Sequence, residues 1–170
     1  MATKGNKKII STPTGTPANK GACVVIVRTD WNASILDELE KGCRKVLAKS
    51  GIKQVKTITV PGAIEIPFAV KSYWEAFKYR DEKPATFIAL GCIIKGDTPH
   101  FDYVCKMAAD GILQLNLTLP VPTIFGVLTV LNEQQARERL GGKHGHKGEE
   151  AAYTALSMIK LNQTFHSRPE

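Results

Sequence analysis

The sequence predicts an α/β fold, in which a four-stranded parallel sheet lies between two layers of helices. Two observations carry this prediction. Four short apolar runs, typical of strands buried on both faces, alternate with segments of helical periodicity. Strands that are joined through helices pair in parallel and leave helices on both faces of the sheet. The length of 170 residues fits a single domain.

The strands are expected over 22–28, 55–60, 86–94 and 123–130. Helices are expected from about Ile35 to Gly51 and over 67–79, 102–117, 132–140 and 148–162. Together these elements predict a flavodoxin-like three-layer sandwich formed by residues 21–170. Residues 1–20 contain the turn-rich segment Ser11–Pro17 and are expected to form a flexible N-terminal arm.

The charge of the chain does not favour nucleic-acid binding. The formal net charge is +7, from 23 basic and 16 acidic residues. The arm contains Lys4, Lys7, Lys8 and Lys20 and no acidic residue. The rest of the chain therefore has 19 basic and 16 acidic residues. A surplus of only +3 on the domain is too small to indicate a nucleic-acid surface.

Cysteine usage and hydropathy predict a cytoplasmic protein that does not span a membrane. The four cysteines, at 23, 43, 92 and 105, form no C-x-x-C pair, which favours free thiols in a reducing compartment over disulfides or zinc. No run of 18 apolar residues is present, and the N-terminus lacks the apolar core of a secretory signal. A plastid location would require that a transit peptide had been removed.

Ligands of an open parallel sheet bind beyond the carboxyl ends of its strands, so the segments that follow the strands are the candidate site. In the third of them, Thr98 fits a helix N-cap and Pro99 the first helical position, which places His100 in the first turn. The dipole there favours an anion and a neutral imidazole, which could act as a general base. The alternative is a solvent-exposed histidine at a helix end.

The segments after the first two strands offer an aromatic ring and a carboxylate. Trp31 could stack on a flat heterocycle or could simply cover the edge of the sheet. Glu65 lies between apolar residues, where it could form a structural ion pair or bind hydroxyl and N–H groups of a ligand. The Pro61–Gly62 turn would let the backbone approach that ligand closely.

The segment Arg137–Gly148 is basic and glycine-rich, which suits either a solvated loop or phosphate capture by arginine. It lacks the order of a Walker loop, and no G-x-G-x-x-G follows the first strand. His144 and His146 alone are weak signals for metal, and no metal site is predicted. The residues alone therefore support a cofactor-free enzyme acting on a phosphorylated or anionic small molecule.

Five segments in register also resemble one family. They are Trp31–Asn32, Val60–Pro67, Leu90–Val104, Pro122–Thr129 and Glu133–Ala152. In this order and spacing, over about residues 20–163, the chain resembles the lumazine synthases of riboflavin biosynthesis. The resemblance implies a cofactor-independent transferase. It condenses 5-amino-6-ribitylamino-2,4-pyrimidinedione with 3,4-dihydroxy-2-butanone 4-phosphate to 6,7-dimethyl-8-ribityllumazine, releasing phosphate and water.

The resemblance also implies a role for each site residue. His100 would move protons, and Arg139 would assist catalysis by holding the phosphate. Substrate would be bound by further residues with distinct tasks: Trp31 against the pyrimidine ring, Asn32 and Glu65 on the ribityl chain, Ala63, Ile64, Ile93 and Ile94 around the heterocycle, Gly96, Asp97 and Thr98 around the phosphate, and Phe125 and Lys147 closing the site.

In the family, the counterparts of Phe125, Arg139 and Lys147 come from a neighbouring subunit, so the resemblance implies a homopentamer with sites at subunit interfaces. Some members assemble into shells of sixty chains, but Pro13 and Pro17 oppose strand pairing by the arm and favour an isolated pentamer. The sequence departs from the family pattern at Ile64, Asp97 and His146. Two alternatives remain open: a flavin-binding module and a catalytically inactive shell protein.

Overall fold

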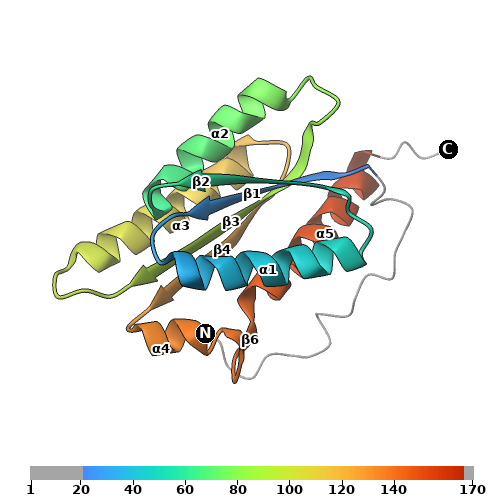
Figure 1. Cartoon of the computed structure of the whole chain (residues 1–170). Helices are drawn as coiled ribbons and strands as arrows, with labels where there is room; N and C mark the ends of the chain where they lie inside the picture. The colour runs from blue at the N-terminus through green and yellow to red at the C-terminus, as the bar shows by residue number, and fades with distance from the viewer. Residues whose placement is uncertain (1–20, 167–170) are drawn as a thin grey trace.

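The computed structural model describes residues 21–166, and the arm predicted over residues 1–20 lies outside them. Four parallel strands form the central sheet in the order β2-β1-β3-β4 (Figure 1). Their bounds are β1 Cys23–Thr29, β2 Gln54–Val60, β3 Pro84–Ile94 and β4 Thr123–Val130. The predicted fold class is confirmed, and each strand starts and ends within two residues of its expected position.

Helices cover both faces of the sheet (Figure 1). The long ones are α1 Ala33–Lys49, α2 Ile66–Phe77, α3 His100–Thr118 and α5 Lys147–His166, and α4 is the short Glu133–Arg137. Helices α1 and α5 pack on one face and α2 and α3 on the other. No helix within residues 21–166 is long and apolar enough to cross a membrane.

Strand β1 shows why these residues form a buried strand. Val24 and Ile26 contribute to the core shared with α1 and α5, whereas Val25 and Val27 contribute to the core shared with α2 and α3. All four are fully buried. Successive side chains of a strand point to opposite faces, so a strand covered on both sides must be apolar at every position.

The prediction missed three short elements. A 3-10 turn, η2, spans Ala63–Glu65, and strands β5 (Leu140–Gly142) and β6 (Gly145–His146) form an antiparallel hairpin. The helix expected over 132–140 ends at Arg137. Gly141 and Gly145 adopt φ angles of 108° and 74°, so the glycines that suggested an open loop instead allow a tight hairpin. Such short elements carry no hydrophobic periodicity.

The start of α3 also differs from the prediction. Pro99 occupies the cap position with helix-like angles, φ −61° and ψ −7°, and no side chain caps the helix. Thr98 is therefore not the N-cap, because the backbone already turns into the helix at Pro99. His100 is the first residue of α3, so its expected place in the first turn is confirmed.

The strand register brings the loops that follow the strands to one edge of the sheet. Thr29 lies beside Val60, and Ile94 lies beside Val130. The chain leaves β1 toward β2 on one side and reaches β3 on the other, so β1 and β3 flank the point where the strand order reverses. Open α/β sheets bind ligands at this point.

Candidate active site

A cleft of about 560 Å³ opens at this edge, between the end of β1 and the start of α3. Ten of the residues predicted for the site line it: Trp31, Asn32, Ala63, Ile64, Glu65, Ile93, Ile94, Gly96, Thr98 and His100. They come from the β1–α1 turn, the turn after β2, the end of β3 and the loop into α3. Segments far apart in the sequence therefore form one cleft.

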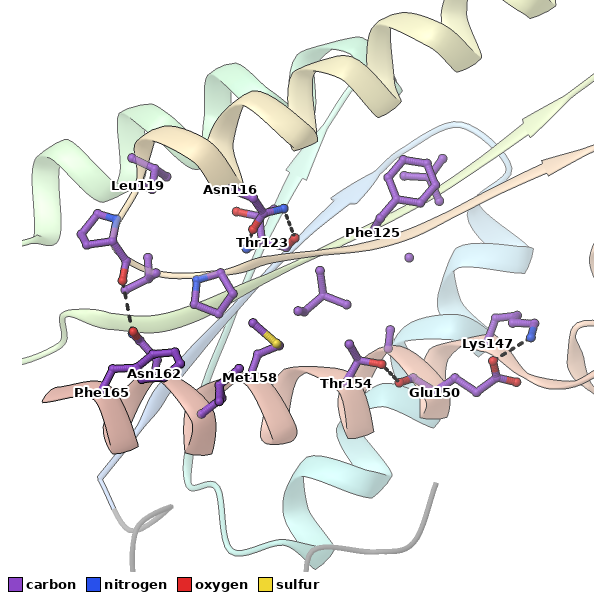
Figure 2. A pocket seen from close by; sticks show the side chains of 18 of the residues that line it. Asn116, Leu119, Thr123, Phe125, Lys147, Glu150, Thr154, Met158, Asn162 and Phe165 are labelled. Carbon is purple, nitrogen blue, oxygen red and sulfur yellow. Dashed lines mark hydrogen bonds and ion pairs between the residues drawn. The ribbon is translucent and has the colours of Figure 1, made fainter. Parts of the chain in front are cut away.

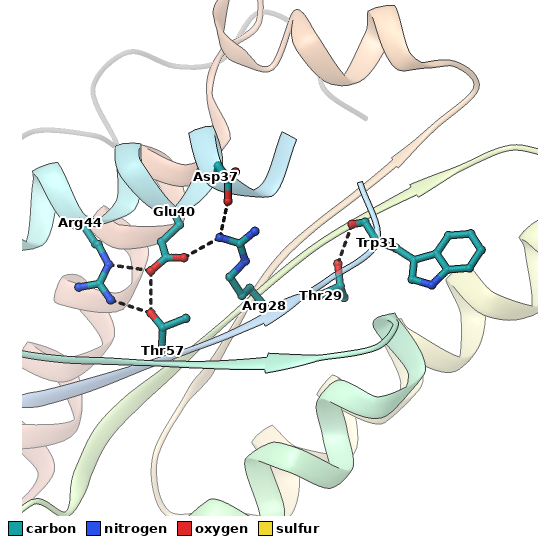
Figure 3. Close-up of polar contacts among 7 residues, drawn as sticks. All are labelled: Arg28, Thr29, Trp31, Asp37, Glu40, Arg44 and Thr57. Atoms are coloured by element: carbon teal, nitrogen blue, oxygen red, sulfur yellow. Dashed lines mark hydrogen bonds and ion pairs between the residues drawn. The ribbon is translucent and has the colours of Figure 1, made fainter. Parts of the chain in front are cut away.

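The turn that carries Trp31 is fixed by its neighbours. Asn32 has φ 61°, a left-handed conformation that asparagine tolerates, and its Nδ2 donates to the Cys92 carbonyl over 2.9 Å. The Thr29 hydroxyl donates to the Trp31 carbonyl (Figure 3). Trp31 itself is 73% exposed, which is too much for a residue packed over the sheet edge, and it lines the cleft.

An ionic network behind this turn ties β1, β2 and α1 together (Figure 3). Arg28 Nη1 lies 2.8 Å from Asp37 and 2.9 Å from Glu40, and Glu40 also accepts hydrogen bonds from Arg44 and Thr57. Burial alone would raise the pKa of Glu40, but the hydrogen bonds from Thr57, Arg44 and Arg28 outweigh it and lower that pKa. Glu40 is therefore ionised at neutral pH, and its bonds hold together the elements on which the Trp31 turn rests.

Glu65 is a half-buried carboxylate of the cleft, at the end of η2. Its side chain forms no ion pair or hydrogen bond within residues 21–166, so the structural ion pair, one of the two alternatives for Glu65, is not formed there. A Cβ on Gly62 would lie 2.9 Å from Glu65 Oε2, so glycine makes room for the carboxylate. A half-buried acceptor without a protein partner is suited to bind hydroxyl or N–H groups of a ligand.

His100 lies at the cleft wall as an exposed side chain. It forms no hydrogen bond or ion pair within the described part of the chain, so its ring nitrogens remain available for a substrate. Phe101 and Val104 line the cleft beside it and were not predicted. Their signal was present in the sequence, because residues three and four positions apart share one side of a helix, as Val104 does with Phe101 and with His100.

Four predicted residues do not line this cleft. Phe125 and Lys147 lie instead in a second groove of about 890 Å³ between β4 and α5, where Lys147 Nζ pairs with Glu150 at 2.6 Å (Figure 2). Arg139 is half-buried in the segment between α4 and β5. Asp97 is exposed in the loop before α3. One chain therefore brings together only part of the predicted site.

No group of three or more His, Cys, Asp or Glu side chains within residues 21–166 could hold a metal ion. All four cysteines are free thiols, and three of them are buried. Burial raises the pKa of Cys43 to about 12 and that of Cys92 to about 11. The thiol of Cys92, although it borders the cleft, is therefore protonated at neutral pH and poorly suited to act as a nucleophile.

Sequence comparison agrees with the motifs and the cleft. The family model for 6,7-dimethyl-8-ribityllumazine synthase matches residues 21–163. Curated proteins of that name are similar over most of their length. The one from Porphyromonas gingivalis is 42% identical over 149 residues, covering 86% of this chain and 89% of the relative. The one from Cytophaga hutchinsonii is 44% identical over 136 residues, covering 79% and 82%.

A protein of the same name from Parabacteroides distasonis is 41% identical over 139 residues, covering 81% of this chain and 84% of the relative. Matches at this level span the whole sheet and every loop that forms the cleft. The chain belongs to the 6,7-dimethyl-8-ribityllumazine synthase family.

Proposed function

We propose that the cleft at the carboxyl edge of the sheet is where this enzyme of riboflavin biosynthesis joins its two substrates. The reaction is the condensation of the ribitylaminopyrimidinedione with 3,4-dihydroxy-2-butanone 4-phosphate, without a cofactor. The observation that carries the proposal is the meeting of Trp31, Glu65 and His100 in one cleft, each without a binding partner among the described side chains.

Each binding role follows from what its residue offers. The exposed indole of Trp31 can stack on the pyrimidine. The Glu65 carboxylate can accept hydrogen bonds from the ribityl hydroxyls, and Asn32, whose Nδ2 already holds the Cys92 carbonyl, has its Oδ1 left for the same chain. Ala63, Ile64, Ile93 and Ile94 supply backbone groups and apolar walls.

The phosphate end of the second substrate would lie near the start of α3. Free N–H groups at a helix N-terminus and the positive end of its dipole stabilise an anion. Gly96, Asp97 and Thr98 belong to the loop that leads into this terminus, and Arg139 would add a guanidinium. Asp97 does not line the cleft, which limits its repulsion of the phosphate.

The chemistry then proceeds in three steps. The amine of the pyrimidine attacks the ketone and forms an imine with loss of water. His100 removes a proton next to the imine and phosphate leaves, its charge stabilised by Arg139 and the helix terminus. The enol left by loss of phosphate tautomerises to a ketone, and the ribitylamino nitrogen attacks this carbonyl and closes the ring with loss of a second water. Because both substrates are reactive, holding them in place supplies much of the acceleration.

The working unit in this proposal is a homopentamer in the cytoplasm. Phe125 and Lys147 lie in a groove separate from the cleft, and Arg139 lines neither, so a neighbouring subunit would bring them to the cleft of the first. Phe125 and Phe165 line the groove and are 44% and 74% exposed. Exposed aromatic residues of this kind are typical of a protein interface. The free thiols suit a reducing compartment.

The activity is tested by mixing the purified protein with both substrates and following the fluorescence of the lumazine product. Product is expected at a rate that saturates with each substrate. A folded protein that binds flavin or forms shells without making product would refute the proposal and support one of the two alternatives.

The oligomeric state is tested by light scattering, which should give a mass of about 93 kDa for the pentamer, five times the 18.6 kDa chain.

The shared site has a test of its own. His100→Ala should slow turnover without abolishing it, since positioning remains, and Arg139→Ala should raise the KM for butanone phosphate. If the two residues act in one site from different chains, mixed oligomers of the two variants regain sites in which both residues are intact. Activity that stays at the average of the two pure variants after subunit mixing would exclude a site shared between chains.

A further inference from the structure

The short helix α4 contains a hub of hydrogen bonds centred on Gln135. Its backbone N–H donates to Asn132 Oδ1 over 2.9 Å, and its side-chain Oε1 accepts from the Leu131 N–H over 2.9 Å. Its carbonyl oxygen accepts from Arg139 Nη1 over 2.7 Å. One residue thus connects the end of β4, the cap of α4 and the guanidinium of Arg139.

Asn132 is the N-cap of this helix. Its backbone is extended, with φ −156° and ψ 168°, and its side chain accepts the bond from Gln135. A helix of five residues is too short to persist on its own, because nucleation costs more than its few bonds return. Its conformation therefore depends on the cap, on the Gln135 side chain and on Ala136, which is fully buried.

The guanidinium that this helix holds has no counter-ion in the described part of the chain. Arg28, Arg44 and Arg137 pair with carboxylates, whereas the only hydrogen bond of the Arg139 guanidinium within residues 21–166 goes to the Gln135 carbonyl. Arginine carries five N–H donors, so four remain for a ligand. A half-buried cation held by one carbonyl is suited to bind an anion if its direction is fixed.

The same segment links Arg139 to Lys147. The Arg139 carbonyl accepts a hydrogen bond from the Lys147 N–H over 2.9 Å, and the Arg139 N–H donates to the Ala136 carbonyl over 3.0 Å. Both the N–H and the carbonyl of Arg139 are therefore hydrogen-bonded, and the segment that follows α4 is tied to Lys147, the first residue of α5. A shift of α4 would move the two cationic residues together.

We propose that Asn132 and Gln135 are positioning residues, which hold the Arg139 guanidinium in the orientation that binds the phosphate of the second substrate. The inference rests on the proposed function, since it requires Arg139 to contact that phosphate. Neither Asn132 nor Gln135 needs to touch substrate. Their contribution acts through the carbonyl that fixes Arg139.

The test measures steady-state constants for each substrate separately. Asn132→Ala removes the cap, a loss of about 1 kcal/mol, and should raise the KM for butanone phosphate about five-fold. The KM for the pyrimidine should stay within about two-fold. Asn132→Ser, which keeps a capping oxygen, should restore the KM. Arg137→Ala, which breaks only the exposed pair with Glu133 on the same helix, is the matched control and should change neither constant.

Each outcome decides a different point. If Asn132→Ala acts through Arg139, adding it to Arg139→Ala should cause no further rise in KM. An unchanged KM in Asn132→Ala, with a raised KM in Arg139→Ala, would overturn the inference and leave the proposed function intact. An unchanged KM in Arg139→Ala would remove Arg139 from the phosphate site and refute both.

Equal effects on the two KM values, or failure of Asn132→Ser to restore them, would mean that the cap serves folding alone. If Asn132→Ala does not fold, Gln135→Met provides the second variant. It keeps the length of the side chain and removes the acceptor of the Leu131 N–H. It should raise the KM for butanone phosphate selectively, and a folded Gln135→Met enzyme with unchanged constants would overturn the inference.

Discussion

Gly148→Ala should destabilise this protein strongly, although the same change stabilises most helices. Gly148 is the second residue of α5 and is buried where that helix meets α1. A Cβ built on it would lie 2.0 Å from the Leu39 carbonyl oxygen and 2.8 Å from its carbon. These are backbone atoms of α1, which cannot rotate away as a side chain could.

The size of the effect follows from two opposing contributions. Alanine in place of glycine favours a helix by about 1 kcal/mol at most. Against this, real Cβ atoms essentially never approach another atom within 3.0 Å, so α1 and α5 must separate by about 1 Å. Overpacking costs about 1–3 kcal/mol, and a 1 Å gap forfeits up to about half of the dispersion energy between the two helices.

The two helices meet through fully buried residues, among them Leu39, Cys43, Ala152 and Leu156. The packing energy that these residues would forfeit should exceed the gain in helix propensity, for a net destabilisation of about 3 kcal/mol. In a chain of this length, that destabilisation lowers Tm by about 6–12 °C. The measurement is a thermal melt at fixed protein concentration, because assembly would make Tm depend on concentration.

Gly96→Ala is the matched control for stability. It makes the same chemical change at a glycine with no atom within 4 Å of the new Cβ and without a positive φ. Its Tm should stay within about 2 °C of the parent protein, as for an ordinary surface substitution. A Gly148→Ala melt as close to the parent as that of the control would show that α1 and α5 can separate freely, and the steric argument would fail.

Three further predictions concern charge, stacking and thiol reactivity. Glu40→Gln should lower stability by about 2 kcal/mol at pH 7. Because the pKa of Glu40 is lowered in the folded protein, this stability is present above its ordinary value of 4.5 and is lost as pH falls through the folded pKa. Trp31→Ala should raise the KM for the pyrimidine about ten-fold and Trp31→Phe much less, in lumazine-forming assays. Cys43 and Cys92, with pKa values raised to about 12 and about 11, should not react with DTNB at pH 8 until the protein unfolds.

Each of these has an outcome that contradicts it. A melting difference between parent and Glu40→Gln that is as large at pH 3 as at pH 7 would mean that the carboxylate charge is not what stabilises the network. Equal KM values for Trp31→Ala and the parent enzyme would remove stacking from pyrimidine binding. Modification of Cys43 at pH 8 in the folded protein, followed by mass spectrometry of peptides, would show that helix α1 opens readily.

The sequence was sufficient for the sheet because burial on both faces leaves a strong pattern. β1 and β3 are apolar almost throughout, and such runs are unlike any amphipathic helix. The rule that ligands lie beyond the strand ends then selected Trp31, Glu65 and His100, which the cleft brings together. Phe101 and Val104 were missed because helical spacing groups them with His100 but does not tell whether that side of the helix faces a core or a ligand.

What the sequence could not determine depends on contacts between distant segments. It marked Arg139 and Lys147 as cations near glycines, but only the tertiary structure connects Arg139 to the Gln135 carbonyl and Lys147 to Glu150. It suggested Thr98 as a cap, but the backbone at Pro99 made a side-chain cap unnecessary. Periodicity records which face of an element is buried, whereas hydrogen-bond partners depend on how elements meet, and that is decided when the whole chain packs.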